Sequence, residues 1–406
     1  MSKSTNAAPS STPVHAPAGI SPIAVWLSWH VVFLILGVVH VLFQPVPVPP
    51  ELARQQGHRP AANRVEQMAL NVWYQWDTEH FVQIAERGYR ADDGTAAFHP
   101  LFPVTGALVG RLVGGNALLG LFIVASICSL LFLIYLERLF GLDLPPEDAR
   151  RAMLYMVHLP MAYALFAPYT EGMFLLFTTL AFLLVRGGKW WWAGLAGGLA
   201  TLTRQQGIFL LLPLLWECWE ASGRNPRKLF VNWRSALGLG LIPLGLLVWL
   251  VYRALALSDV VFDFSKPQTL IYGLLLSRSS TRIVSEQSFV PPWTAIWSAM
   301  SDPNLNLIIS VAFIIPLVFG WRILWRIRPS YAIYALTIIL LSLSLATGTP
   351  NFYLGLPRHC LLAFPLAIPL ALWGRNWAVD LTVKAVGAFL LMTGVLFFFQ
   401  GVSWVP

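Results

Sequence analysis

Long runs of apolar residues, separated by short polar turns, fill most of this chain and restrict it to one class of fold. Because a helix needs about 20 apolar residues to cross a bilayer, the sequence predicts an all-α, polytopic membrane protein with about 11 transmembrane helices. The consecutive pairs 152–185 and 190–218 are short for two crossings each, so we expect a tight helical hairpin in each. The predicted spans are 23–43, 116–137, 152–168, 170–185, 190–204, 206–218, 235–257, 304–324, 330–347, 358–374 and 376–398.

Composition excludes the main alternatives. Hydrophobic residues make up 57% of the chain and charged residues 11%, against roughly 45–50% and about 25% in soluble domains. The three cysteines lie in or beside apolar segments, which predicts neither a disulfide framework nor a metal cluster. The basic residues are scattered through short loops, a pattern typical of membrane topology and not of a nucleic-acid surface. We therefore expect a lipid bilayer as a partner, no nucleic acid, no metal and no cofactor.

The basic residues also orient the predicted bundle, because cytoplasmic loops carry an excess of Lys and Arg. With the N-terminus in the cytoplasm, the short external loops hold only Arg204 and Arg358. Residues 1–22 are then a disordered cytoplasmic tail, 23–398 a single transmembrane domain and 399–406 an external tail. A bacterial plasma membrane and an endoplasmic reticulum membrane fit this topology equally well.

Two large external segments remain, 44–115 and 258–303. Within the first, we expect Phe98–Leu112 to lie flat on the membrane surface, because counting it as a span would invert every later loop. Residues Asn71–Gly88 read as an amphipathic helix, with Asn71 as the expected cap and Gly88 as the end. The first external loop is thus predicted to hold two juxtamembrane helices.

Asp77 lies in the middle of the aromatic face of the Asn71–Gly88 helix, which also carries Trp73, Trp76, His80, Phe81 and Ile84. A carboxylate on such a face costs free energy unless it is paired or used. Asp77 is therefore a candidate catalytic residue. The structural alternative is a buried cap or a salt bridge to Arg87 or Arg90.

Other polar residues gather at the external ends of later spans. Arg204 and Arg358 are candidates for binding a phosphate, because arginine makes bidentate, charge-assisted contacts with it; their structural alternative is snorkelling to lipid headgroups. For Glu171 the alternative is an ion pair with one of these arginines. The candidate substrate-binding residues are Trp76, His80, His99, Tyr169, Glu171, Gln205, Gln206 and His359. Away from this end, Asp380 and Lys384, four residues apart, are expected to neutralise each other.

Together these residues suit a lipid-linked phosphate substrate, whose chain would lie between spans and whose phosphate would lie at the membrane boundary. Asp77 could then accept the proton of an attacking hydroxyl as a general base. The sequence contains no D-x-D, Walker A, H-E-x-x-H or G-x-S-x-G motif. These absences favour a metal-independent donor held on a lipid phosphate.

Several segments between about 70 and 370 resemble the PIG-V-type family of membrane mannosyltransferases. The segments are Trp76-Asp77-x-x-x-Phe81 to Tyr89, Ala97-Phe98-x-Pro100-x-Phe102-Pro103, Tyr169-Thr170-Glu171, Thr203-Arg204-Gln205-Gln206 and Pro357-Arg358-His359. The resemblance implies the GT-C class: a membrane fold, a polyprenyl- or dolichyl-phosphate sugar donor, Asp77 as base and inversion at the sugar. It implies mannose as the sugar and a lipid-linked glycan, GPI-like or glycolipid, as the acceptor.

We therefore expect a GT-C-like glycosyltransferase. One rival is a transporter or lipid flippase, which usually has ionisable residues near the bilayer centre and two repeated halves. Neither feature is evident in this sequence. The other rival is a non-catalytic subunit of a glycosylation complex, which would be favoured if the pocket under Asp77 were closed or if Asp77 paired internally with Arg87.

Overall fold

The computed structural model describes residues 20–43, 61, 63–90, 93–231, 233–257, 288–301, 305–346 and 356–401. The first half contains α1 Pro22–Phe43, α3 Arg64–Ala69, η1 Asn71–Trp73, α4 Asp77–Arg87, η2 Thr95–Ala97, α5 Leu101–Leu112, α6 Ala117–Gly141, α7 Pro146–His158, η3 Ala162–Leu165, α8 Glu171–Arg186 and α9 Trp190–Thr203. The second half contains η4 Gln205–Leu210, α10 Leu211–Ala221, α11 Pro226–Val231, α12 Trp233–Leu239, α13 Leu241–Ala256, β1 Ser288–Phe289, α15 Pro292–Ser301, α16 Leu305–Ala312, α17 Ile314–Ile327, α18 Pro329–Ser344, β2 Leu345–Ala346, α19 Leu356–Leu361, η5 Phe364–Leu366, α20 Ala367–Trp373 and α21 Trp377–Phe399. The two-residue strands β1 and β2 pair antiparallel, and helices make up nearly all the rest.

Parts of the predicted tails and external loops lie outside the described residues. They are residues 1–19, 44–60, 62, 91–92, 258–287, 302–303, 348–355 and 402–406.

Five described helical stretches are long and apolar enough to cross a membrane. They are Pro22–Phe43, Ala117–Gly141, Ala236–Ala256, Ile308–Ile327 and Trp377–Phe399. These stretches confirm the helical, polytopic part of the prediction. Helices also occupy the other predicted spans, but they are shorter, so a count of about 11 crossings stays a prediction.

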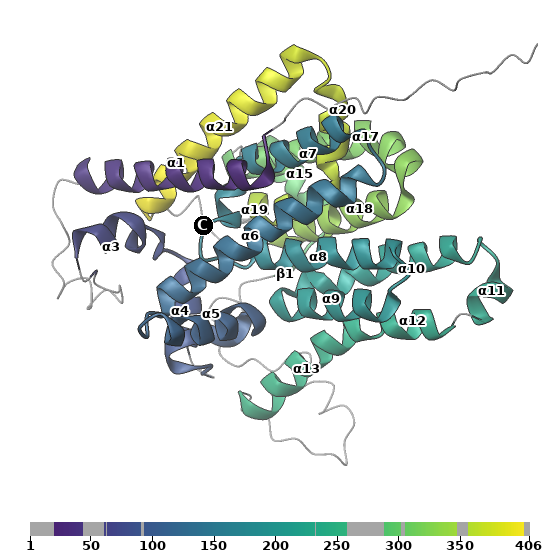
Figure 1. The fold of residues 1–406 in the computed structure, drawn as a ribbon, viewed down its shortest axis with the longest axis horizontal. Helices are drawn as coiled ribbons and strands as arrows, with labels where there is room; N and C mark the ends of the chain where they lie inside the picture. The colour runs from purple at the N-terminus through teal and green to yellow at the C-terminus, as the bar shows by residue number, and fades with distance from the viewer. Residues whose placement is uncertain are drawn as a thin grey trace, which may run out of the picture.

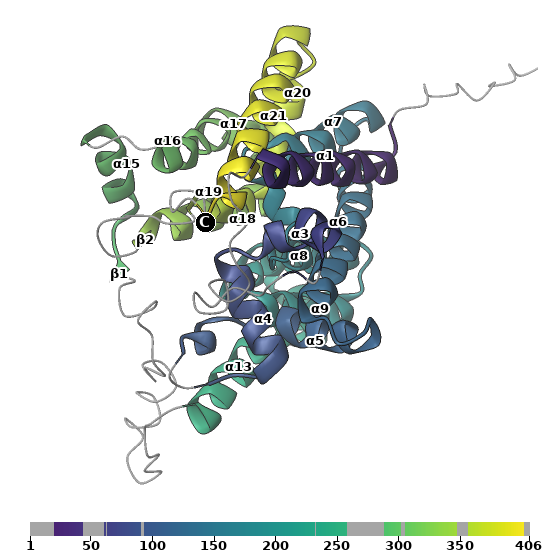
Figure 2. The same ribbon diagram turned by 90° about the vertical axis from the view of Figure 1, so that its left-hand side faces the viewer.

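The helices form one bundle with two distinct ends. In Figure 1, α3, α4 and α5 lie at the left-hand end, while α11 and the loops beside it lie at the right-hand end. We call these the α4 end and the α11 end. Helix α8 packs against α6 and α9 and is buried along most of its length. Helix α21 packs against both α1 and α7, as the two ribbon views show (Figures 1 and 2). The core that holds the α4 end in place is thus built around α6 and α8.

Helix α5 lies tightly against α6 because glycines remove side chains from their contact. A Cβ atom on Gly120 would lie 2.3 Å from both the Gly106 oxygen and the Gly110 nitrogen. The opposite side of α5 exposes Val104, Leu108 and Leu112, which follow one another at four-residue steps. This apolar stripe fits the predicted placement of the segment on the membrane surface, which stays a prediction.

Replacing Gly120 by alanine is expected to destabilise the protein by about 1–3 kcal/mol, because the new methyl group meets backbone atoms that cannot move aside. Gly141→Ala on the same helix is the matched control, since a Cβ atom there would meet nothing within 4 Å. Thermal unfolding in detergent measures both variants. A melting temperature for Gly120→Ala at or above that of Gly141→Ala would contradict this packing.

The predicted helix over Asn71–Gly88 begins later than expected. Asn71 lies in the turn η1, and α4 begins only at Asp77, after Trp76 adopts a positive φ of 56°. Gly88 ends the helix as predicted, with a φ of 77°. The aromatic face divides at the break, because Trp73 packs on Phe33 of α1 and Phe399 of α21 instead of continuing along α4. Tertiary packing therefore overrides the local periodicity, at a backbone cost of about 1–3 kcal/mol for the residue with positive φ.

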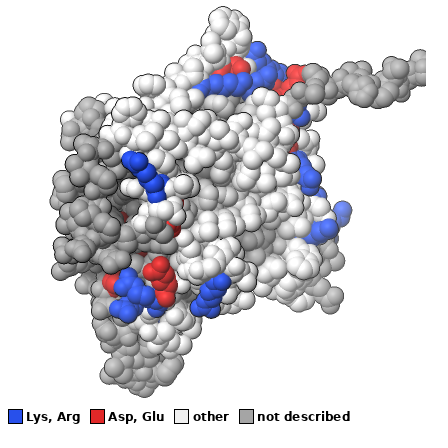
Figure 3. All heavy atoms as spheres, turned by 60° about the vertical axis from the view of Figure 1, so that its left-hand side comes forward, with Lys and Arg blue, Asp and Glu red and all other residues white. Residues whose placement is uncertain are grey.

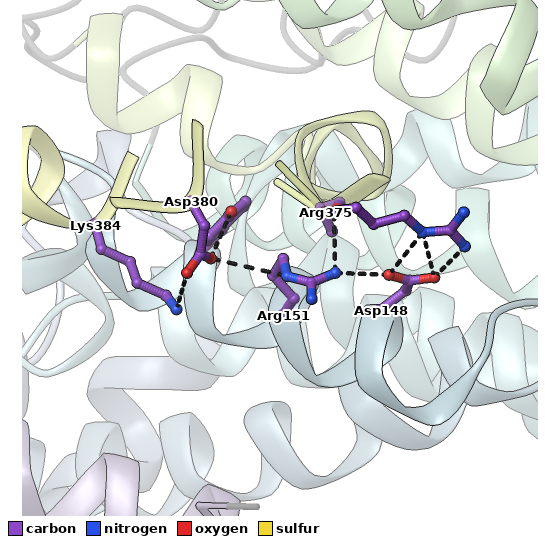
Figure 4. Close-up of polar contacts among 7 residues, drawn as sticks. Asp148, Arg151, Arg375, Asp380 and Lys384 are labelled. Carbon is purple, nitrogen blue, oxygen red and sulfur yellow. Dashed lines mark hydrogen bonds and ion pairs between the residues drawn. The ribbon is translucent and has the colours of Figure 1, made fainter. Parts of the chain in front are cut away.

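Ion pairs between helices concentrate away from the α4 end. Figure 4 shows Asp148 of α7 between Arg151 and Arg375, at 2.6 and 2.5 Å. Lys384 pairs with Asp380 at 2.7 Å, which confirms the predicted neutralisation within α21. Arg375, between α20 and α21, and Arg151, which also lies 3.8 Å from Asp380, therefore link α7 to the C-terminal part of the bundle.

Candidate active site

The α4 end carries a chain of four alternating charges that come from four separate segments. Arg358 Nη2 lies 2.6 Å from Asp77 Oδ2, and Arg358 Nε lies 3.1 Å from Glu171 Oε1. The same Glu171 oxygen accepts a hydrogen bond of 2.7 Å from Arg204 Nη1. The formal charges of Asp77, Arg358, Glu171 and Arg204 therefore sum to zero. Arg204 and Arg358, which were predicted to bind phosphate, therefore form one network with Asp77, the predicted catalytic residue, and Glu171, a predicted substrate-binding residue.

The local fold explains how each charge is tolerated. Asp77 and Glu171 are the first residues of α4 and α8, where the helix dipole stabilises negative charge. Arg204 follows the last residue of α9 in extended backbone, with φ −152° and ψ 144°, where the dipole favours a cation. Arg358 lies on the short helix α19, between the two carboxylates. Helix termini thus converge on this point and supply part of the stabilisation of the buried charges.

The network is largely removed from water. The Glu171 side chain is fully buried, and those of Arg358 and Arg204 are 8% and 11% exposed. Asp77 is the most accessible member, with 29% of its side chain exposed. In Figure 3 much of this face is uncharged, and a basic side chain lies beside a hollow in which acidic atoms are visible. A reacting group approaching from outside would meet Asp77 first.

The charges around Asp77 set its protonation state. Burial raises the pKa of the Asp77 carboxyl, but the charge and hydrogen bond of Arg358 more than offset this, so the pKa lies below its ordinary value. Arg204 and His80 act in the same direction. For His80 itself, burial lowers the pKa against the opposing charge of Asp77. Asp77 is thus ionised at neutral pH and His80 is uncharged.

Several polar atoms near the charges are buried without a hydrogen-bond partner among the described residues. They are Trp76 Nε1, His80 Nδ1, Tyr169 OH, Glu171 Oε2, Arg358 Nε and Arg358 Nη1. Unsatisfied buried polar atoms each cost about 1–3 kcal/mol and require an explanation. Polar atoms of a bound substrate would provide partners.

The ion pair expected as the alternative for Glu171 is confirmed, whereas the salt bridge from Asp77 to Arg87 or Arg90 and the snorkelling of the two arginines are wrong. Asp77 pairs with Arg358 and not with Arg87 or Arg90; Arg87 is at the far end of α4, about 15 Å along the helix. Arg204 and Arg358 point into the bundle toward carboxylates instead of snorkelling outward. The Asp77–Arg87 pair that would have favoured a non-catalytic subunit is therefore not formed.

The remaining predicted residues divide between the network and its surroundings. The Tyr169 ring lies under the Arg358 guanidinium, 4.5 Å away. His80 stacks on Phe98, and His359 follows Arg358 on α19. Gln205 is exposed and Gln206 buried on η4, directly after Arg204.

Two features of the site were not predicted. Thr170 accepts a hydrogen bond of 2.7 Å from Arg204 Nη1, and its place beside Glu171 was the available signal. The His99 ring is held in place by the backbone of Thr201, since its Nδ1 lies 2.7 Å from the Thr201 backbone oxygen. That contact leaves only its Nε2 edge for a substrate.

Within the described residues, no group of three or more His, Cys, Asp or Glu side chains is placed to hold a metal ion.

His99 gives the protein a specific pH dependence of stability. Burial lowers the pKa of His99 from 6.5 to about 4, partly opposed by the hydrogen bond to Thr201. Below pH 6.5 the unfolded chain takes up a proton at this residue and the folded protein does not, so stability falls as the pH falls from 6.5 toward 4. The loss is up to about 3 kcal/mol. Melting temperatures of wild type and His99→Gln across this range are expected to converge at low pH; parallel curves would contradict the assignment.

Comparisons with known proteins match the region that carries most of this network. Residues 49–216 match the model of the family described as Mannosyltransferase (PIG-V). The chain is PIG-V-like over that region. The PIG-V-like region contains Asp77, Glu171 and Arg204 and ends before Arg358.

The similarity extends to one curated relative. GPI alpha-1,6-mannosyltransferase 2 of Rattus norvegicus is 27% identical over 282 residues, which are 64% of this chain and 55% of the relative. The chain thus spans about half the length of the curated relative it matches. The predicted resemblance to PIG-V-type mannosyltransferases is confirmed.

A solved structure shares the fold across nearly the whole chain. ArnT from Cupriavidus metallidurans, bound to undecaprenyl phosphate, superposes with a TM-score of 0.50 at 13% identity. The match covers 94% of this chain and 74% of ArnT. At this identity the likeness shows the fold alone, and it agrees with the predicted GT-C-like helical architecture.

Proposed function

We propose that this PIG-V-like chain is an integral membrane glycosyltransferase that moves mannose from a polyprenyl- or dolichyl-phosphate donor to a lipid-linked glycan acceptor. The observation that carries the proposal is the Asp77–Arg358–Glu171–Arg204 network, which joins a partly exposed carboxylate to two buried arginines at one end of an apolar bundle. The family similarity of residues 49–216 supports the sugar, and the lipid in the ArnT structure supports the donor class.

In the proposed reaction, an acceptor hydroxyl attacks the anomeric carbon from the side opposite the phosphate, and the bond from that carbon to the phosphate oxygen breaks. Asp77 accepts the hydroxyl proton as general base, and the sugar is inverted. A carboxylate with a low pKa suffices if the proton moves late, once positive charge has built up on the anomeric carbon. Arg358 and Arg204 stabilise the charge that develops on the leaving phosphate.

The surrounding residues have distinct parts in this scheme. Glu171 is a positioning residue, because its Oε1 atom contacts both arginines and the side chain is fully buried. The unpartnered atoms of Trp76, His80 and Tyr169 are candidate contacts for sugar hydroxyls. His99, Gln205, Gln206 and His359 would lie around the acceptor. In the predicted topology, with about 11 crossings, this chemistry takes place on the external or luminal side, below the juxtamembrane helices α4 and α5.

The test is transfer by purified protein in detergent from radiolabelled polyprenyl-phosphate-mannose to a total lipid extract of the source organism. We expect label to move into a new lipid in the presence and absence of a chelator. Parallel reactions with glucose and arabinose donors test the choice of sugar. Absence of transfer from all three donors would contradict the proposal.

A further inference from the structure

Asp77 and Arg358 have different roles in the proposed reaction, the first as base and the second in binding phosphate, yet in the structure they form an ion pair with each other. The 2.6 Å contact between Arg358 Nη2 and Asp77 Oδ2 occupies both groups. A carboxylate engaged in this way is a weak base, and a guanidinium engaged in this way offers less to a phosphate. Breaking this contact would free the Asp77 carboxylate to act as a stronger base and Arg358 Nη2 to bind a phosphate.

Arg358 has the contacts needed to remain in place when Asp77 leaves. Its Nε lies 3.1 Å from Glu171 Oε1, and its guanidinium lies over the Tyr169 ring. Its Nε and Nη1 are both buried without a hydrogen-bond partner in the described part of the chain, so the Glu171 contact is an ion pair without a hydrogen bond. A guanidinium presents five N–H donors in a fixed fork. One edge of Arg358 is thus anchored, and a new anion could take Nη1 and Nη2 together.

Of the two carboxylates that contact Arg358, Asp77 is the one that another anion can displace more easily. Its side chain is 29% exposed, whereas Glu171, the other carboxylate on Arg358, is fully buried. As the first residue of the eleven-residue helix α4, Asp77 keeps the stabilisation of the helix dipole after the arginine has gone. The free-energy cost of separating the pair is therefore smaller than for a carboxylate enclosed in the bundle.

We propose that Asp77 occupies an anion site on Arg358 in the free protein, and that the phosphate of the lipid donor displaces it and thereby frees the base. This proposal rests on the proposed function. A phosphodiester with one negative charge replaces a carboxylate with one negative charge, so the cation remains compensated. In the transfer step the phosphate gains one negative charge when it leaves, and Asp77 loses one when it takes the proton. The donor must bind before the acceptor hydroxyl can be deprotonated.

Binding of the sugar-free lipid isolates the exchange from catalysis. Undecaprenyl phosphate is titrated onto wild type, Asp77→Asn and Asp77→Ser in the same detergent, and affinity is measured by calorimetry. Because both variants remove the competing carboxylate, each is expected to bind about tenfold more tightly than wild type. Glu86→Gln, which changes an exposed carboxylate on the same helix, is expected to match wild type.

The outcomes separate the exchange from the proposed function. If wild type transfers sugar while both variants bind the lipid no more tightly than wild type, the exchange is wrong and the function stands. If neither variant yields folded protein, the ion pair is a structural tie and the exchange is also wrong. If wild type neither transfers sugar nor binds the lipid, the proposed function itself fails.

Discussion

Replacing Asp77 by asparagine is expected to lower sugar transfer by about 10²–10⁴-fold, the usual contribution of a general base. Asparagine has nearly the same shape as aspartate but cannot accept the proton of the attacking hydroxyl. The ion pair with Arg358 is lost, but that arginine keeps its contact with Glu171, so the protein is expected to remain folded. The measurement is the initial rate of transfer with labelled donor, with the melting temperature recorded for the same samples.

The matched control for this variant is Glu86→Gln. Glu86 lies on α4 nine residues after Asp77, is exposed, and loses the same charge when it is replaced. Its rate is expected to stay close to that of wild type. A wild-type rate for Asp77→Asn would remove Asp77 from the reaction and leave it as a residue that holds Arg358 in place.

Replacing Glu217 by glutamine is expected to cause the largest loss of stability, about 3–5 kcal/mol. Glu217 is 3% exposed in α10 and accepts two hydrogen bonds of 2.6 Å from Arg328 and one of 2.5 Å from Ser330. Glutamine has no negative charge to compensate the arginine and only one oxygen to accept its hydrogen bonds. The result would be seen as a melting temperature several degrees lower in detergent, with transfer activity retained in the protein that stays folded.

Glu220→Gln on the same helix is the matched control, because it removes the same charge from an ion pair whose arginine is exposed. Glu220 pairs with Arg224 at 2.8 Å, four residues along, and that arginine side chain is 65% exposed. Exposed pairs of this kind contribute only about 0.2–1 kcal/mol. Equal losses for the two variants would show that the Glu217 network does not hold α10 to α18.

The helices were predictable because their signal is local. A run of about 20 apolar residues favours a membrane-spanning helix whatever its neighbours are, and the bounds of the described helices α1, α6 and α21 lie no more than four residues from the predicted ones. Gly88 ends α4 as predicted, because a positive φ at that position suits glycine. The gathering of Glu171, Arg204 and Arg358 at one end of the bundle also followed from their places at helix termini.

The partners of these charges could not be read from the sequence. Asp77 and Arg358 are 281 residues apart, and Arg328 and Glu217 are 111 apart. Residues nearer in the sequence, such as Arg87 for Asp77, offered the same charge and were equally reasonable. Long side chains at the ends of several helices can pair in many ways, and packing of the helices selects among them.

Local sequence patterns were enough to predict a helical, polytopic protein and to put its candidate site residues near helix ends. Apolar length and helix termini are properties of single segments, so their physics acts without regard to the rest of the chain. The tertiary structure alone decided that α4 begins at a strained Trp76 and that Arg358 serves both Asp77 and Glu171. Those features balance burial, charge and backbone strain among segments far apart in sequence, and that balance exists only once the bundle is packed.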